Sequence, residues 1–370
     1  MSYRFIFCKL SVKSVSNFRA SKILVSLLIV LLVLLSKNGG QVNASAGNAS
    51  TITTSPISIS LSGLPGSKVS TVLHLQNNSN EAVDIGIKLE KFDAKGDNGQ
   101  ANIYNPSKSD ISRQWVSFSQ NSFIAQPGVW NSDTMTISLP KTAAFGYYYA
   151  VLFYPETPLN TLIPSSNTVK GANAILILVN ALSPNATTNL KVQSFSVAKS
   201  SNQYLPVGFN LNVRNVGNVF TAPSGDIYIS RTPNGPSLDT LDINKGGGNI
   251  LPGTNRVFST VWADGFPVYQ DKILNGAVLS NKSGAPIRQL KWNLNKISDF
   301  RFGEYYAKLV LVYNDGSRDI PVTSEVSFWV VPWLLITVII LAVALVGVGV
   351  WTISKGLVRK FRPKKNVRRW

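Results

Sequence analysis

The stretch FGYYYAVL at residues 145–152 returns as FGEYYAKL at residues 302–309, and both fit the pattern F-G-x-Y-Y-A-x-L. Earlier in each half of the chain, LHLQNNSN at residues 73–80 and LNVRNVGN at residues 211–218 share L-x-[LV]-x-N-x-x-N. Alternating apolar residues beside a glycine or a polar turn are typical of strands that enter or leave turns. The repeat predicts two similar domains in tandem, and chance similarity between strand-rich segments is the alternative.

The region between residues 52 and 329 favours strands throughout. Short β-branched and aromatic runs alternate with clusters of Asn, Gly, Ser, Pro and Asp, as in antiparallel sandwiches. The expected strands are Ile57–Leu61, Val69–Gln76, Val83–Leu89, Thr134–Leu139, Tyr147–Tyr154, Ala174–Val179, Val207–Val213, Asp226–Ser230, Val257–Trp262, Tyr305–Tyr313 and Thr323–Val330. We predict an all-β fold with two tandem immunoglobulin-like β-sandwich domains, residues 52–182 and 188–329.

The second repeat copy predicts which strand face is buried. Side chains alternate across a strand, so Glu304 and Lys308 mark the wet face and Tyr305 marks the core face. Transfer of this pattern to the first copy places Tyr148, Ala150 and Leu152 inside and Tyr147, Tyr149, Val151 and Phe153 outside. So apolar an outer face is expected to be covered, either by residues 91–126, by the neighbouring domain, or by a partner or glycan.

Residues 330–353 contain no charged side chain, and Lys and Arg crowd residues 354–370. An apolar run of this length can cross a hydrocarbon layer of about 30 Å as a helix. A basic cluster directly after such a helix holds that end in the cytoplasm. We therefore predict one transmembrane helix and a basic cytoplasmic tail, because the alternative, a buried core helix, is rarely apolar on every face.

Residues 1–46 fit a secretory signal peptide. Basic residues precede the apolar run at 23–35, and Ala44-Ser45-Ala46 offers a small-residue cleavage site. An uncleaved signal anchor is the alternative. Either arrangement predicts a single chain in the cell membrane whose middle region lies outside.

The net charge of +18 is concentrated at the two ends. Residues 1–46 hold six basic side chains and residues 332–370 hold eight, without any acid. The region between them keeps 22 basic against 18 acidic residues, a net +4. This distribution excludes the basic surface expected of a nucleic-acid binder.

The only cysteine, Cys8, lies in the predicted signal peptide, so we expect no disulfide in the mature protein. Secreted eukaryotic domains often carry disulfides, so their absence favours a bacterial source.

The residues needed for catalysis or metal binding are scarce. The only histidine, His74, lies in an expected strand, which favours a structural role over a lone base or ligand. The acidic segment 93–99 lacks the closing Glu of an EF-hand and is expected to be a plain turn, and the glycines at 246–248 a flexible loop. We predict a protein that is not an enzyme and has no cofactor or metal; a glycan-processing enzyme with paired acids is the alternative.

The order of segments resembles the WxL-interacting proteins of Gram-positive bacterial surfaces. The local resemblance covers roughly residues 55–179 and rests on Leu64-Pro65-Gly66-Ser67, Gln76-Asn77-Asn78-Ser79, residues 97–104, Trp115-Val116-Ser117-Phe118 and residues 145–150. It implies a peptidoglycan-binding first domain and a second domain that engages another protein.

The resulting hypothesis is a non-catalytic, membrane-anchored cell-surface protein that adheres to cell-wall glycan or to a surface protein. Flat aromatic rings suit sugar faces, so the candidate ligand-binding residues are Trp115, Trp130, Tyr104, Tyr147 and Tyr149; a core role is the alternative for each. The alternative function is a structural or accessory subunit of an envelope secretion or assembly complex.

Overall fold

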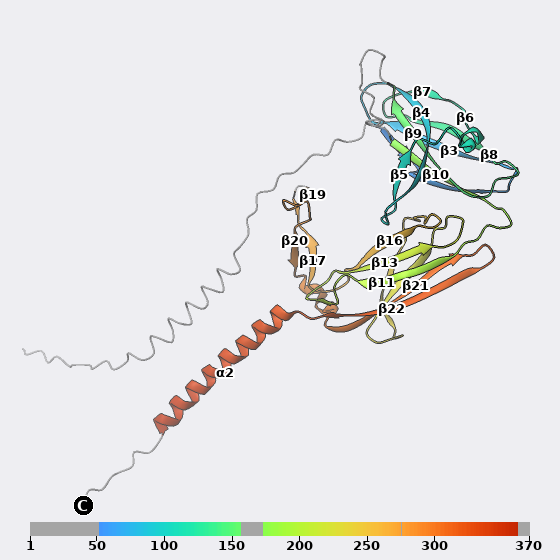
Figure 1. Ribbon diagram of the computed structural model, residues 1–370. Coiled ribbons are helices and arrows are strands. Elements are labelled where there is room, and N and C mark those ends of the chain that lie inside the picture. Colours follow the sequence, from blue (N-terminus) through green and yellow to red (C-terminus); the bar gives the residue numbers. More distant parts are fainter. Residues whose placement is uncertain (1–51, 157–172, 275, 362–370) are drawn as a thin grey trace, which may run out of the picture. The chain divides into compact units, whose positions relative to one another are not determined.

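The computed structural model describes residues 52–156, 173–274 and 276–361. Strands dominate these residues, and one long helix follows them (Figure 1). The prediction of an all-β fold with an apolar C-terminal helix is confirmed. The predicted signal peptide lies outside the described residues, as do residues 362–370 of the predicted tail.

The N-terminal part forms two sheets, which we call the N-terminal sheet pair. The four-stranded sheet has the order β1-β3-β8-β6, and the larger sheet has the order β2-β10-β9-β4-β5 with β7 paired to β4. The bounds are β1 Ile52–Ser55, β2 Ser58–Gly63, β3 Lys68–Asn77, β4 Val83–Lys95, β5 Gln100–Tyr104, β6 Val116–Phe118, β7 Ser122–Ala125, β8 Trp130–Ser138, β9 Phe145–Pro155 and β10 Asn173–Ala181, with the short helix η1 at Ile111–Trp115.

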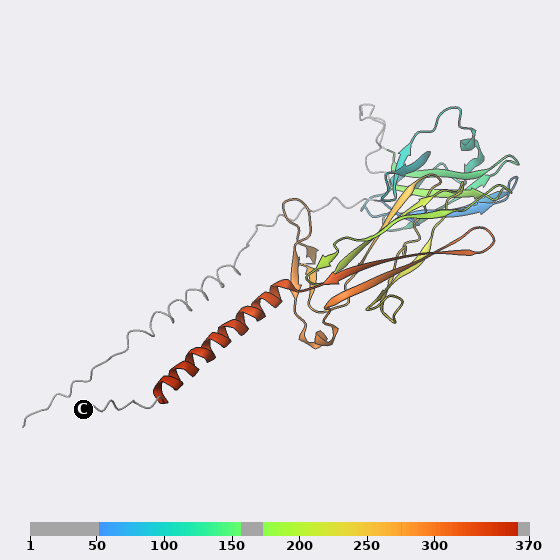
Figure 2. The ribbon, with the colours of Figure 1, turned by 60° about the horizontal axis from the view of Figure 1, so that its bottom comes forward.

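The following part forms the C-terminal sheet pair. A three-stranded sheet has the order β11-β13-β16, and a five-stranded sheet has the order β12-β22-β21-β14-β15. The bounds are β11 Leu190–Val197, β12 Ser201–Asn202, β13 Val207–Asn215, β14 Ser224–Ser230, β15 Ser237–Asp242, β16 Asn255–Trp262, β21 Gly303–Asn314 and β22 Asp319–Val330. In Figure 2, β21 and β22 form the long orange antiparallel hairpin.

Each sheet pair encloses its own apolar core. The N-terminal core includes Leu73 and Leu75 of β3, Ile137 of β8 and Ile177 of β10, which come from both sheets. The C-terminal core includes Phe209, Trp262, Tyr305 and Phe328, also from both sheets. Every strand expected from alternation is present, because period-2 apolar patterns bury one face of each strand.

The repeated asparagine fills the same role in both sheet pairs. Asn77 is fully buried; its Nδ2 donates to Glu81 O (2.7 Å) and Ala125 O (2.9 Å), and its Oδ1 accepts from Ser79 N (2.9 Å). Its side chain therefore joins the end of β3 to the turn after it and to β7.

The second copy, Asn215, is also fully buried. Its Nδ2 donates to Val219 O (2.8 Å) and Ile250 O (2.9 Å), and its Oδ1 accepts from Gly217 N (2.9 Å). The bonds to residues two and four positions later match those of Asn77. This correspondence supports a true structural repeat.

The F-G-x-Y-Y-A-x-L copies correspond with a shift of one residue. Tyr305 Oη accepts a hydrogen bond from Phe302 N (3.2 Å), three residues earlier. In the first copy, Tyr147 Oη accepts from Ala144 N (3.1 Å), so Tyr147 is the counterpart of Tyr305, although the letters align Tyr148. Such a tyrosine near the start of a strand is a hallmark of immunoglobulin-type sandwiches.

The predicted faces of the first copy are therefore wrong. A shift of one residue inverts every side chain of a strand. Tyr149, Val151 and Phe153 lie in the N-terminal core, whereas Ala150 packs in a second cluster with Phe92, Leu178, Phe220 and Leu251 and with Tyr148 beside them. The prediction for the second copy, with Tyr305 and Leu309 inside, is confirmed.

Helix α2, Trp333–Phe361, begins three residues after the predicted start. Val330 still belongs to β22, where it pairs with Gly303, and Pro332 precedes the helix. A proline is tolerated at a helix start because its missing N–H has no partner there. By length and composition, Trp333–Lys355 could cross a membrane. The helix continues into the predicted tail.

Short elements connect β16 to β21. They are β17 Val268–Asp271, β18 Ile273–Leu274, β19 Ala277–Val278, β20 Arg288–Lys291 and the short helix η2 Leu294–Asp299. Asp271–Arg288 belongs to a compact unit separate from both sheet pairs, and within it β18 pairs with β19.

We expect Asn77→Ala to lower the free energy of unfolding by about 2 to 4 kcal/mol, because it leaves buried carbonyl and N–H groups without partners. Denaturant unfolding of the purified full chain measures this change. The control is Asn102→Ala on β5, whose side chain is exposed and for which the change should stay within about 0.5 kcal/mol. Equal effects of the two substitutions would contradict a structural role of Asn77.

Candidate functional site

Three of the five predicted aromatic residues lie in the interior of the N-terminal sheet pair. Tyr149 is fully buried, and its Oη donates to Ser112 O at 3.1 Å. The rings of Trp115 and Tyr147 meet edge to face at 4.9 Å and pack against the N-terminal core. The structure therefore brings these three together as packing residues.

The other two predicted residues are exposed at separate places. Trp130 begins β8 opposite Gln76 and is 49% exposed. Tyr104 ends β5 opposite Lys91 and is 43% exposed. The five residues thus do not form one aromatic platform.

Lys91 links the buried aromatic group to η1. Its Nζ lies 3.2 Å from Asp110 Oδ2, donates to Ser112 Oγ at 2.9 Å, and stands 4.7 Å from the centroid of the Tyr149 ring. Burial raises the pKa of the Tyr149 phenol. These contacts organise the interior around Tyr149, whose side chain is fully buried.

Burial and hydrogen bonding act in opposite directions on Asp110, the residue that caps η1. Burial alone raises the pKa of this carboxyl group. The hydrogen bonds from Ser112 Oγ and N and the positive charge of Lys91 outweigh burial, so the net pKa of Asp110 is lowered.

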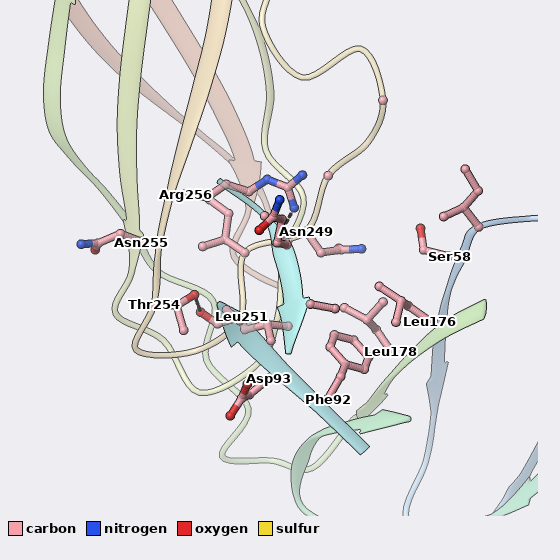
Figure 3. Close-up of a pocket in the computed structure, with 18 residues that line it drawn as sticks. Ser58, Phe92, Asp93, Leu176, Leu178, Asn249, Leu251, Thr254, Asn255 and Arg256 are labelled. Carbon is pink, nitrogen blue, oxygen red and sulfur yellow. Dashed lines mark hydrogen bonds between the residues drawn. The ribbon is translucent and has the colours of Figure 1, made fainter. Parts of the chain in front are cut away.

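A pocket of about 230 Å³ lies where β4, β5 and β10 approach the segment before β16 (Figure 3). Its apolar wall includes Phe92, Leu176, Leu178 and Leu251, which Figure 3 shows grouped together. This wall adjoins the cluster that also buries Ala150 and Phe220. The pocket therefore joins an apolar floor to a polar rim.

The Arg256 side chain gives the rim its most distinctive chemistry. Its Nη1 donates to Asn249 O at 2.7 Å, and its Cζ lies 5.4 Å from the centroid of the Phe258 ring. Burial lowers the pKa of the Arg256 guanidinium from its ordinary value. Arg256 takes part in none of the ion pairs found among residues 52–156, 173–274 and 276–361.

Two glycines make room for this guanidinium. A Cβ added at Gly99 would lie 2.5 Å from Arg256 Cζ, and one added at Gly248 would lie 2.4 Å from Arg256 Nη2. Gly99 also has a φ of +77°, a backbone conformation that residues other than glycine rarely adopt. We call this arrangement the Arg256 cradle: Gly99, Gly248 and Arg256.

The hairpin between β4 and β5 is held beside the Arg256 cradle. Val257 N, one residue after Arg256, donates to Asp97 O at 2.6 Å. Asn249 Nδ2 donates to Ser60 Oγ at 2.9 Å. Gly99 and Gly248, which were expected in a plain turn and a flexible loop, thus form two walls of one site. Sequence analysis missed this site.

A half-buried guanidinium with unused donors suits a carboxylate. The planar fork of arginine matches the two oxygens of a carboxylate, and charge-assisted hydrogen bonds are the stronger class. Phe92, Leu178 and Leu251 would receive an apolar group beside that carboxylate. The Arg256 cradle can therefore bind an anion that has an apolar neighbour.

The described residues offer no arrangement for metal binding, since no group of three or more His, Cys, Asp and Glu side chains among them could hold an ion. His74 Nδ1 lies 2.8 Å from Ser132 Oγ on the neighbouring strand β8. This hydrogen bond gives the histidine a structural partner, as the sequence suggested.

No protein-family model and no curated protein matches the sequence. Several solved structures resemble the chain. One is a chain of the chaperone–tip adhesin complex of CFA/I fimbriae biogenesis, with 21% identity and a TM-score of 0.32, covering 65% of this chain and 98% of that one. The class 5 fimbriae chaperone CfaA has 19% identity and a TM-score of 0.33, and the match covers 65% of this chain and 99% of CfaA. The E. coli chaperone DraB has 9% identity and a TM-score of 0.30, and the match covers 73% of this chain and 97% of DraB.

The comparison contradicts the prediction of a surface protein that binds peptidoglycan, since the structures found include the class 5 fimbriae chaperone CfaA and the chaperone DraB. It agrees better with the alternative, an accessory subunit of an envelope assembly complex. Membership of the WxL-interacting family stays a prediction. Since no identity among the three exceeds 21% and no TM-score exceeds 0.33, we argue function from this chain's own residues.

We expect acid to weaken the fold partly through Asp110. Its folded-state pKa lies below the unfolded value, so the carboxylate stabilises the fold above about pH 4, and this contribution is lost as the pH falls through the folded-state pKa. Asp110→Asn should lower stability at neutral pH by less than about 1 kcal/mol, because solvent screens a partly exposed pair. The variant should also lose less stability than the wild type on acidification.

Unfolding measurements between neutral and acid pH on the full chain provide the test. The control is Asp97→Asn, which removes an exposed carboxylate from the hairpin between β4 and β5. An identical pH dependence in Asp110→Asn and wild type would refute the assignment.

Proposed function

We propose that this chain is a non-catalytic accessory subunit of an envelope assembly complex, and that it holds a partner protein by a carboxylate in the Arg256 cradle. The partner's carboxylate belongs either to its C-terminus or to an acidic side chain. In this proposal the two sheet pairs are immunoglobulin-like domains that work outside the membrane.

The observation that carries the proposal is the half-buried guanidinium without an acidic partner. Arg256 donates to one backbone oxygen, Asn249 O, and enters no ion pair within the described parts of the chain. Charged groups that lose water are costly unless they are paired. A carboxylate from a partner would replace the lost water, and such hydrogen bonds contribute about 1.5 to 3 kcal/mol each.

The apolar wall indicates what accompanies the carboxylate. Leu176 and Leu178 project from the outer face of β10, and Phe92 and Leu251 lie with them in the pocket (Figure 3). Centres of protein–protein contacts combine apolar residues with arginine. A polypeptide with an apolar residue next to its carboxylate therefore fits better than a sugar, which exposes many hydroxyl groups.

We further propose that residues 1–46 export the chain and that α2 anchors it. Trp333–Lys355 has the length and composition of a membrane span, and basic residues follow it. The positive-inside rule then places the tail in the cytoplasm and both sheet pairs outside.

Peptides that end in apolar residues, with a free or an amidated C-terminus, test this function by fluorescence anisotropy with the full chain. A third peptide carries an internal acidic side chain and an amidated end, so the source of the carboxylate is distinguished. We expect Arg256→Gln to weaken binding roughly tenfold or more, from the loss of a charge-assisted hydrogen bond.

The matched control is Arg214→Gln. Arg214 is exposed on β13 directly opposite Asn255, so this substitution removes the same charge from the same sheet. Gly248→Ala keeps the charge but displaces the guanidinium, and it should weaken binding as well. The proposal fails if no peptide distinguishes wild type from Arg256→Gln, or if Arg214→Gln weakens binding equally.

A further inference from the structure

An exposed apolar surface lies at the end of the C-terminal sheet pair where the chain passes into α2. We call it the anchor-side face, and its members are Trp292, Leu294, Ile297, Phe302, Trp329 and Trp333. Leu294 is 69% exposed and Ile297 is 65% exposed, although both are aliphatic. The proposed function does not use this surface.

Strand register places part of this face beside the start of α2. Gly303, the first residue of β21, pairs with Val330, the last residue of β22. Phe302 therefore lies next to the end of β22, and Trp329 lies one residue before it. Only Val331 and Pro332 separate β22 from Trp333.

Contacts join Trp292 to the same end. Its ring lies 6.3 Å from that of Tyr204, and Tyr204 follows Asn202 by two residues. Asn202 O accepts from Val331 N at 2.7 Å, immediately before the helix.

Helix η2 is held at the same end of the C-terminal sheet pair. The Trp292 and Phe266 rings lie 5.6 Å apart, and Phe266 N donates to Asp299 O at 3.0 Å. Leu294 and Ile297 of η2 are thus attached to the end of the sheet pair that adjoins α2.

The chemistry of the face indicates its occupant. Tryptophan concentrates at the boundary between hydrocarbon and headgroups, and an exposed apolar patch of this kind usually has a covering partner. Lys291 and Lys296 flank the patch, are exposed, and enter no ion pair in the described ranges. Free lysines beside apolar residues attract anionic lipid headgroups.

We propose that the anchor-side face inserts into the headgroup region of the membrane that α2 crosses. This inference rests on the proposed anchoring by α2. The occupant is the lipid surface, because a span that begins at Trp333 brings lipid within a few residues of Trp329. The face then holds the C-terminal sheet pair against the membrane at a second place.

Single-cysteine labelling of the full chain tests the proposal. Cys8→Ser removes the only cysteine, and Ile297→Cys or Leu294→Cys then carries an environment-sensitive fluorophore. The protein is placed in phosphatidylcholine vesicles with and without phosphatidylglycerol, and nitroxide lipids labelled near the headgroup serve as quenchers.

Val216→Cys is the matched control. Val216 is exposed directly after β13, whose nine residues span roughly 30 Å from the end near Tyr204. Labels at residues 294 and 297 should be quenched roughly twofold more than the label at residue 216, since interfacial apolar faces lie about 5 to 10 Å into the boundary. Phosphatidylglycerol should increase this difference, and Lys291→Gln with Lys296→Gln should remove the increase.

A label at Val343 within α2 separates the two proposals. If lipids with the nitroxide deep in the acyl chain do not quench the label at 343, anchoring by α2 is wrong. If these lipids quench the label at 343, but headgroup nitroxide quenches the labels at 294 and 297 no more than the label at 216, the anchor-side face does not touch lipid and this inference is wrong. Shielding of 294 and 297 from aqueous iodide without quenching by lipid would assign the face to a protein and would also overturn it.

Discussion

The hydrogen bonds of Asn215 are the constraint on which the candidate site depends. Its side chain holds Ile250 O, and its backbone accepts from Gly253 N at 2.9 Å and donates to Thr254 O at 3.0 Å. These bonds fix both ends of the turn that leads from Asn249 to Arg256. The residue that marks the repeat in the sequence therefore also positions the guanidinium, and Asn77 provides the equivalent support in the other sheet pair.

Strand β10 shows why one apolar segment can serve both packing and recognition. Ile175, Ile177 and Val179 enter the N-terminal core, while Leu176 and Leu178 project from the opposite face. A strand buried on both faces has a continuous apolar sequence. Cover by residues 91–126 was expected for the face of β9 with Tyr147 and Tyr149, and Trp115 and Ser112 contact these two tyrosines. The opposite face also has a cover, since Phe92 and Phe220 pack near Tyr148.

Much of the fold is predictable because alternation is a local property. Val207–Val213 and Tyr305–Tyr313 reveal their strands by period 2, but β5 and β15 are short and polar and exist through pairing with longer neighbours. The faces of residues 145–152 could not be inferred from matching letters, since one residue of shift reverses them. The matching positions are marked instead by the hydrogen bonds of Tyr147 and Tyr305, each of which accepts from the N–H three residues earlier. The Arg256 cradle escaped prediction because Gly99, Gly248 and Arg256 come from separate segments, and neither glycine belongs to a known phosphate or metal motif.

The direct passage from β22 into α2 has a mechanical consequence. A chain held in a membrane by α2 and pulled by a bound partner receives the load at Val330, along the axis of β22. The hydrogen bonds between antiparallel strands lie perpendicular to that axis. All twelve paired positions from Asp319 to Val330 would then resist together in shear, instead of opening one at a time from an end. Under such a load, the hairpin of β21 and β22 would carry the tension along its whole length.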